Sequence, residues 1–340
     1  MAQHGGDLLL GAARLGETAP LGLAKPVRGE ALEPGLGAGL AEEVAEALDG
    51  ERRSLLRHEV GKHVELHDRF DYLQKLGRRT VGKPQMGLRI LAPTGSGRSK
   101  AAEAYIDLVQ RRRPRTDTFL PILKIDLEKA CTSKKLMTSI LNKFGDPYVA
   151  YGNELTLKRR AFACIERFRT ELLIVDEVQH LNYRNGQNND VTDTLKGMLD
   201  GGVVPMVFLG TEDAEQMFKR NLQLNGRLLA PCDLDPLNSK SAEDRRLFAA
   251  FVAKLEAVIV AQDILPEPSC LGEAGLLPGL FEVSQGVVGR VSRLFLAALD
   301  IAIRRGATRL ELYDLALAVD RWAIPQAFAK TNPFRKLSDA

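Results

Sequence analysis

The sequence is poor in the features that mark membrane, secreted and metal-stabilised proteins. Its four cysteines are far apart, and none has the paired spacing that predicts a zinc site or a redox dithiol. No apolar run is long enough to cross a bilayer, and the N-terminus lacks the basic start and continuous apolar stretch of a signal peptide. We therefore expect reduced thiols, no membrane partner and a cytoplasmic location.

An excess of charge of one sign is also missing. Lys and Arg number 47 and Asp and Glu number 44, so the net charge is only +3. No overall field then attracts nucleic acid, and any DNA contact has to come from a local patch. The 340 residues, 45% hydrophobic and 27% charged, are typical of a globular protein with one large core or two smaller ones.

The most informative segment is a glycine-broken loop between an apolar run at 87–91 and a helical pattern from Ala101. This layout predicts a strand, a phosphate-binding loop and a helix, in which backbone N–H groups and the helix N-terminus face an anion. Alone, the segment is also compatible with an ordinary glycine turn. The residues expected to contact a nucleotide, taken here to be ATP, are Pro93, Thr94, Gly95, Ser96, Gly97, Arg98, Ser99 and Lys100.

The loop departs from the Walker A pattern at two positions. Ala92 stands at the first glycine, and Arg98 stands where a lysine would reach the β- and γ-phosphates. Arginine keeps the charge, but its planar fork is bulkier than an ammonium and cannot act as a point charge between phosphate oxygens. We therefore expect weaker ATP binding and slow hydrolysis.

A second segment, Glu-Leu-Leu-Ile-Val-Asp-Glu at 171–177, has the Walker B arrangement of a buried strand ending in two carboxylates. Asp176 is expected to bind the nucleotide site's Mg²⁺ together with the Ser99 hydroxyl. Glu177 is expected to orient and deprotonate an attacking water. A buried strand with a polar turn is the alternative, but two carboxylates after a phosphate loop make it the weaker one.

Strands and helices alternate through the middle of the chain. Alternation of this kind predicts a mostly parallel sheet with helices on both faces, with ligands at the carboxyl ends of the strands. After a last strand at 229–234 the pattern is helical only, as in the lid of AAA+ ATPases. The expected elements are 87–91, 99–110, 119–127, 134–144, 154–170, 172–176, 191–200, 204–210 and 213–220, and then helices 242–262, 272–284, 287–304 and 310–322.

These patterns predict five regions along the chain. They are a largely disordered extension (1–50), a helical lead-in (51–80), an α/β nucleotide-binding domain (81–238), a helical lid (239–324) and an extended C-terminal tail (325–340) that docks on a partner or a neighbouring subunit.

The chain resembles the TniB/TnsC family of transposon-encoded AAA+ ATPases. The resemblance rests on the segments 92–100, 172–181 with Asp176-Glu-Val-Gln-His180, Val207-Phe-Leu-Gly-Thr211, Gln223-Leu-Asn-Gly-Arg227 and Gly286-Val-Val-Gly-Arg290. It implies a three-layer P-loop α/β domain with a parallel central sheet, followed by a small all-helical lid. It also implies a homo-oligomer, either a ring or a helical filament, whose ATP sites are completed between subunits.

Further site residues follow from these motifs. Thr211 ends a strand beside the Walker B strand, so its hydroxyl is expected to sense the γ-phosphate. Arg227 is expected to reach the ATP of a neighbouring subunit, with Arg220 as the competing residue. The resemblance makes Arg290 the lid arginine that folds over the phosphates, with Arg293 as the alternative.

The resemblance also implies double-stranded DNA as a partner, held by sequence-independent backbone contacts. The residues expected to make them are Lys134, Lys135, Lys158 and Arg159, although a solvated helix face is the alternative. The expected function is an ATP-dependent transposition regulator that assembles on target DNA and recruits a separate DDE-type transposase, with a TniQ-like targeting protein as a further candidate partner. A nucleotide-binding scaffold with little hydrolysis and a helicase-loader-type AAA+ protein are the alternatives.

Overall fold

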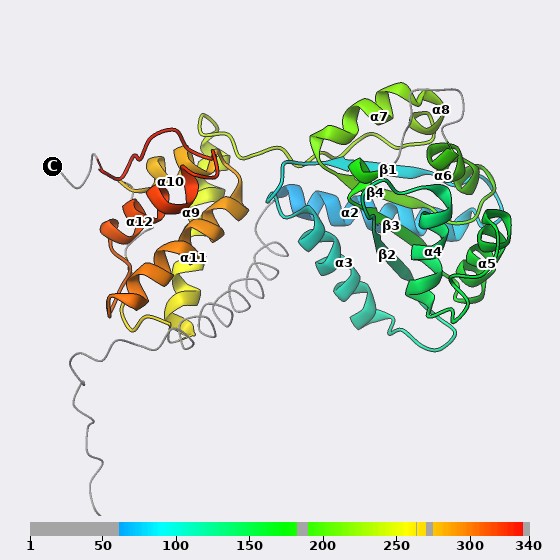
Figure 1. The fold of residues 1–340 in the computed structure, drawn as a ribbon, viewed down its shortest axis with the longest axis horizontal. Helices are drawn as coiled ribbons and strands as arrows, with labels where there is room; N and C mark the ends of the chain where they lie inside the picture. The colour runs from blue at the N-terminus through cyan, green and yellow to red at the C-terminus, as the bar shows by residue number, and fades with distance from the viewer. Residues whose placement is uncertain (1–60, 182–189, 263, 270–274, 336–340) are drawn as a thin grey trace, which may run out of the picture.

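The computed structural model describes residues 61–181, 190–262, 264–269 and 275–335. The expectations for 1–50 and for the start of the helical lead-in lie outside these residues. Figure 1 shows two parts side by side, an α/β part and a helical part, joined by one extended stretch of chain. Within the described ranges, no helix has both the length and the apolar composition that a bilayer crossing requires.

The α/β part is built on four parallel strands in the order β1-β4-β3-β2. Every residue of β3 and β4 is buried, as expected of strands that are covered on both faces. The predicted parallel sheet is confirmed. The strands are β1 (Gly87–Leu91), β2 (Ile122–Asp126), β3 (Leu172–Asp176) and β4 (Met206–Gly210).

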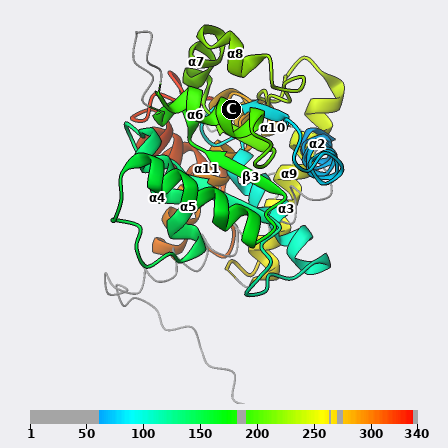
Figure 2. The same ribbon diagram turned by 90° about the vertical axis from the view of Figure 1, so that its right-hand side faces the viewer.

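Helices cover both faces of this sheet, which makes three layers (Figure 1). α2 (Gly61–Arg79) and α3 (Arg98–Arg112) share one apolar cluster with the strands. The opposite face carries a second cluster, and Figure 2 looks towards the α4 and α5 end of that layer. The helices over this face are α4 (Ser133–Phe144), α5 (Glu154–Arg167), α6 (Asp190–Asp200), α7 (Glu215–Arg220) and α8 (Leu222–Asn225).

A fifth segment lies along β1 where the last strand was predicted, at 229–234. The amides of Leu229 and Leu234 donate to the carbonyls of Gly87 and Leu91, at 2.8 and 3.0 Å. Pro231 has no N–H to donate between them, and the following Cys232 donates instead. The segment therefore pairs irregularly and is not a regular strand.

The second part is helical throughout the described residues and has its own apolar core. α11 is its central amphipathic helix, and α12 runs on into a π-helical turn, η3. This arrangement confirms the predicted all-helical lid after the α/β fold. Its elements are α9 (Ala242–Ala261), α10 (Leu277–Ser284), α11 (Val288–Arg304), α12 (Leu312–Ala318) and η3 (Val319–Ala323).

The chain after the lid does not leave it as an extended tail. Over 325–335 it folds back, and the Phe334 ring is fully buried in the lid core. Gly279 of α10 makes room for this ring, because a Cβ on that glycine would lie 2.7 Å from it. The Asn332 side chain donates to Ala316 O at 2.7 Å. Residues 325–335 therefore pack on the chain's own lid, because the apolar Phe334 ring fills the space that Gly279 leaves; docking on a partner stays a prediction.

Candidate functional site

The glycine-broken loop connects β1 to α3 at the carboxyl edge of the sheet. Gly97 caps the helix in the left-handed region with φ 89°, a conformation that glycine adopts without steric cost. Its carbonyl accepts the first helical bond, from Ala101 N at 2.8 Å. The sequence therefore places a helix N-terminus, with its free N–H groups, directly after the loop.

The Arg98 side chain turns away from the open side of this loop and into the protein. Its guanidinium is buried, donates to Ala92 O at 3.2 Å and to Glu177 Oε1 at 2.7 Å, and brings Nε to 3.6 Å from Asp176 Oδ1. The residue at the Walker A lysine position thus pairs with the two Walker B carboxylates. It had been expected to reach towards phosphate.

Asp176 is held from its other side by a residue of the neighbouring strand. Lys124 Nζ lies 3.2 Å from Asp176 Oδ2 and also pairs with Asp126. Burial opposes the charge of Lys124, but the hydrogen bond to Asp126 and the charge of Asp176 outweigh it and raise the pKa of this lysine. Because Asp176 is almost fully buried, these two cations are what make its negative charge tolerable there.

Glu177 stands at a strained point of the turn after β3. Its φ of 61° is left-handed, which is uncommon for a residue other than glycine and is typical of functional turns. One oxygen accepts from Arg98 and the other from the side chain of Gln179. Gln179 in turn accepts from the amide of Thr211 at 3.1 Å. The catalytic-base candidate and the sensor candidate are therefore linked through one glutamine.

The hydroxyl of Thr211 bonds within its own turn, to Asp213 Oδ2 at 3.0 Å. Its role as a phosphate sensor stays a prediction.

The η1 turn (Val178–His180), which includes Gln179, is also anchored to the β2 side of the sheet. His180 O accepts from Cys131 N at 2.9 Å, and His180 Nδ1 lies 3.0 Å from Leu127 O.

The lid touches the phosphate-binding loop through the start of α11. Gly289 N donates to Gly95 O at 3.0 Å, which places Arg290 beside the loop. The turn before α11 requires Gly286, whose φ is +75° and whose added Cβ would lie 2.0 Å from Leu237 O. The glycines of the motif at 286–290 therefore bring the lid backbone close to the nucleotide loop.

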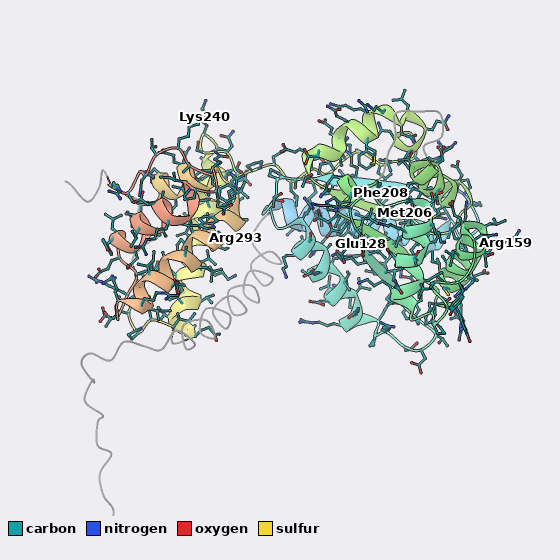
Figure 3. All side chains as sticks on the ribbon, in the orientation of Figure 1. Glu128, Arg159, Met206, Phe208, Lys240 and Arg293 are labelled. Atoms are coloured by element: carbon teal, nitrogen blue, oxygen red, sulfur yellow. The ribbon has the colours of Figure 1, made fainter. Side chains whose placement is uncertain are left out.

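Arg290 is held by its own part of the chain. It donates to Gln285 Oε1 at 2.8 Å, and its guanidinium lies 4.7 Å from the centre of the Phe328 ring. Desolvation lowers the pKa of this arginine. Arg293, the alternative, is exposed on the lid, and Figure 3 places it on the side towards the α/β part.

Unsatisfied buried polar atoms gather at this loop. Within the described residues, four buried side-chain N or O atoms have no hydrogen-bond partner, and three of them are Ser96 Oγ, Arg98 Nε and Arg290 Nε. Buried polar atoms are nearly always paired in folded proteins. Arg98 Nε still faces Asp176 Oδ1 at 3.6 Å, whereas Ser96 Oγ and Arg290 Nε have no acceptor of this kind, and phosphate oxygens have the chemistry that both require.

A divalent cation fits this arrangement poorly. All four carboxylate oxygens of Asp176 and Glu177 already face donors of the protein: Lys124, Arg98, Gln179 and the Glu177 amide. A Mg²⁺ at Asp176 would lie beside two positively charged side chains. In the part of the chain that the structure describes, no group of three or more His, Cys, Asp or Glu side chains could hold a metal. The predicted Mg²⁺ on Ser99 and Asp176 stays a prediction.

Arg227 lies away from these groups, after α8. Its Nε pairs with Asp200 at the end of α6, and its Nη1 donates to Gln223 O at 2.6 Å. The hydrogen bond to Asp200 raises the pKa of Arg227. The competing Arg220 ends α7 and is exposed. The choice between these two arginines stays open.

The four residues predicted to contact DNA belong to two helices that pack on each other, α4 and α5. Lys134 and Lys135 are exposed in the first turn of α4, which Thr132 caps. Lys158 is partly buried over the Phe162 ring, at 5.7 Å. Arg159 is exposed, and Figure 3 shows it at the end of the molecule farthest from the lid. The two pairs therefore belong to two different helices, Lys134 and Lys135 to α4 and Lys158 and Arg159 to α5.

Sequence reasoning missed Lys124 and Gln179 as site residues. The sequence pattern could have identified Lys124, because it is the only charged residue in the run Phe-Leu-Pro-Ile-Leu-Lys-Ile at 119–125. A lone cation in a buried strand needs a nearby anion. Gln179 lies within the motif at 176–180, but nothing in its spacing indicates a bond to Thr211.

Comparison with known families gives one match. A family model described as "Bacterial TniB protein" matches residues 58–236, which is more than half of the chain. A comparison with curated proteins found no match.

Solved structures of similar fold include ORC and Cdc6 proteins. The ORC2 protein of Aeropyrum pernix, in ADPNP-ADP complexes, has a TM-score of 0.53 at 13% identity, covering 74% of this chain and 66% of that one. The ORC1 protein of the same organism, in complex with DNA, has a TM-score of 0.53 at 17% identity, covering 79% and 69%. Cdc6p of Pyrobaculum aerophilum also scores 0.53, at 10% identity, covering 78% and 68%. At these identities the likeness shows the fold alone, a P-loop AAA+ fold, and the chain spans about two thirds of these proteins.

Proposed function

Because the chain belongs to the family of bacterial TniB proteins, which are transposon-associated and have the AAA+ fold, we propose that it is a nucleotide-controlled regulator of DNA transposition. In this proposal, ATP binds between the phosphate-binding loop and the lid. The nucleotide-bound form assembles on target DNA and recruits a DDE-type transposase.

The observation that carries the proposal is the group of unpaired donors at the loop. Ser96 Oγ, Arg98 Nε and Arg290 Nε are buried without a hydrogen bond to any described residue, and the bond from Gly289 to Gly95 brings lid and loop together. Phosphate oxygens would satisfy Ser96 Oγ and Arg290 Nε, since Arg98 Nε faces Asp176 at 3.6 Å. The ADPNP and ADP complexes of the similarly folded ORC2 protein support the choice of an adenine nucleotide.

Hydrolysis is expected to be slow, because the Glu177 carboxylate is engaged. A general base must be free to accept a proton from water, whereas this carboxylate accepts from Arg98 and Gln179. This contact also favours the second candidate function, an assembly scaffold that binds nucleotide with little turnover. Steady-state phosphate release in the presence of DNA separates the two.

DNA binding is proposed for the exposed basic residues of α4 and α5. Lys134 and Lys135 lie in the first turn of α4, where free N–H groups add to the attraction for phosphate. The bond from Cys131 to His180 ties the start of α4 to the turn that follows Glu177. A change at the nucleotide site could thereby reach the proposed DNA contacts. The DNA complex of the similarly folded ORC1 protein supports this partner.

The remaining partners follow from the family resemblance. We propose a homo-oligomer, a ring or a filament, in which Arg227 or Arg220 completes the ATP site of a neighbouring subunit. For Arg227 this requires release from Asp200. A TniQ-like targeting protein is a further proposed partner.

Equilibrium binding of a fluorescent ATP analogue tests the nucleotide site. Arg290→Ala is expected to weaken binding by ~10- to 100-fold, since it removes a charged donor worth ~1.5–3 kcal/mol. Arg293→Ala, on the same helix and exposed, is the matched control and should change little. Equal losses in the two variants would refute the assignment of Arg290.

A further inference from the structure

We propose that Arg98 and Lys124 together take the place of a divalent cation at the Walker B carboxylates, so that this site binds a nucleoside triphosphate or diphosphate without Mg²⁺. The inference rests on the proposed nucleotide function and deepens it. It concerns the groups that neutralise the charges of Asp176 and Glu177. In a metal-dependent site the metal ion would do this.

The contacts already supply what a metal would supply. Asp176 Oδ2 faces Lys124 Nζ at 3.2 Å, and Asp176 Oδ1 faces Arg98 Nε at 3.6 Å. Glu177 Oε1 accepts from Arg98 Nη2 at 2.7 Å. The two carboxylates therefore have two cations from different elements, one from α3 and one from β2.

Burial makes these contacts strong and hard to exchange. The side chains of Arg98 and Asp176 are 8% and 2% exposed, and that of Lys124 is 14% exposed. The buried carboxylate of Asp176 and the partly exposed carboxylate of Glu177 are thus balanced by two positive charges. Asp126, which also pairs with Lys124, is about half exposed and is screened by water. A Mg²⁺ entering here would add two charges to a neutral group, without a free carboxylate oxygen to receive it.

Arg98 makes three contacts at once around the carboxylates. Its Nη1 and Nη2 donate to Ala92 and Glu177, and its Nε, which makes no hydrogen bond, faces Asp176 Oδ1 at 3.6 Å. Lys100, the next lysine along, pairs with Glu103 on its own helix at 3.3 Å. The cation at the carboxylates is therefore an arginine in the Walker A position, assisted by a lysine from the adjacent strand.

The test is equilibrium binding of a fluorescent ATP analogue to the full chain, in Mg²⁺ and in EDTA. For the unaltered protein we expect the two dissociation constants to agree within ~3-fold. A loss of ~10-fold or more in EDTA would overturn the inference. Because this comparison uses the unaltered chain, it does not depend on the folding of any variant.

Two substitutions extend the test. Arg98→Lys replaces the guanidinium by a smaller ammonium and so frees carboxylate oxygens of Asp176 and Glu177. We expect this variant to bind the nucleotide at least ~10-fold more weakly in EDTA than in Mg²⁺. Lys124→Met frees Asp176 Oδ2 and should shift the ratio in the same direction. Arg112→Lys on the exposed end of α3 and Lys219→Met on α7 are the matched controls and should keep a ratio near one.

The readout is the ratio between the two buffers, which a merely structural role of Arg98 or Lys124 would leave unchanged. Ratios near one in all variants would overturn the inference while leaving the nucleotide site intact. Absence of binding by every variant in both buffers would instead overturn the proposed function.

Discussion

Replacing Lys124 by methionine should strongly destabilise the α/β part. The ammonium is the partner of Asp176 Oδ2 at 3.2 Å, and the two side chains are 14% and 2% exposed. Without Lys124, Asp176 keeps only the guanidinium of Arg98, whose Nε is 3.6 Å away. The substitution thus leaves a buried carboxylate that is poorly neutralised.

The magnitude follows from this burial. Removing one partner of a buried ion pair costs ~3–5 kcal/mol, and the remaining contact with Arg98 places Lys124→Met near ~3 kcal/mol. Urea unfolding followed by far-ultraviolet circular dichroism measures this loss in the free energy of unfolding. Lys219→Met is the control, because Lys219 is 67% exposed and water screens its pair with Glu215, so that little stability should be lost.

The loss should also depend on pH. Folding raises the pKa of Lys124 above its ordinary value of 10.5, so its stabilisation is fully present below that pH. It is lost as the pH rises through the folded-state pKa. The difference in unfolding free energy between the unaltered protein and Lys124→Met should therefore be constant from neutral pH to about 10 and shrink above it.

A second substitution, at Asp176, tests whether Lys124 stabilises the fold through its charge. Asp176→Asn removes the charge that Lys124 neutralises, so the double variant should be at least ~1 kcal/mol more stable than the sum of the single losses implies. Additive losses would refute the argument, as would a Lys124→Met variant that loses no more stability than Lys219→Met.

Three further predictions concern turnover, the lid and DNA. Arg98→Lys should raise steady-state phosphate release several-fold, since a lysine no longer holds Glu177 by a planar fork; equal rates in the two proteins would refute this role. Phe334→Ala should lower the free energy of unfolding of the lid by ~3–5 kcal/mol. The unfolding transition followed through Trp322, the single tryptophan, which belongs to the lid, should then come earlier. An unshifted transition would contradict the burial of the Phe334 ring. The double variant Lys134→Ala/Lys135→Ala should make the association constant for duplex DNA less dependent on salt. The slope of its logarithm against the logarithm of the salt concentration should fall by up to ~2, equally for unrelated DNA sequences. An unchanged slope would exclude both lysines as phosphate contacts.

Controls for these predictions come from the same elements. Arg112→Lys lies on the helix of Arg98 but at its exposed end, and it should leave phosphate release unchanged. Tyr313→Ala removes an exposed lid aromatic and should leave the Trp322 transition within ~0.5 kcal/mol. Lys143→Ala lies in the last turn of α4, away from the proposed contacts, and should keep the salt slope.

The sequence predicted the fold well where local pattern determines it. β1 and β3 begin and end at the expected residues, because a short, mostly apolar run bounded by turn residues favours a buried strand. Helix α4 begins within one residue of its predicted start, where Thr132 provides an N-cap. The family assignment from the motifs was confirmed by the family model.

Side-chain direction was the part that local pattern could not determine. A Walker A position indicated that Arg98 lies at the nucleotide loop, but its turn towards Glu177 depends on a residue 79 positions away. The pairing of Arg227 with Asp200, and the link from Gln179 to Thr211, are likewise set by packing between elements. Phe334 was assigned to an extended tail because nothing in the sequence marks the space that Gly279 leaves for it.

The central claim is that the loop and the lid together hold the phosphates of a nucleotide. An experimental structure of the full chain with a bound, non-hydrolysable ATP analogue tests it most directly. Phosphate oxygens are expected to lie within hydrogen-bond distance of Ser96 Oγ and Arg290 Nε, two buried donors that make no hydrogen bond within the described part of the chain. Phosphates bound elsewhere, with these two donors still without hydrogen bonds, would contradict this claim.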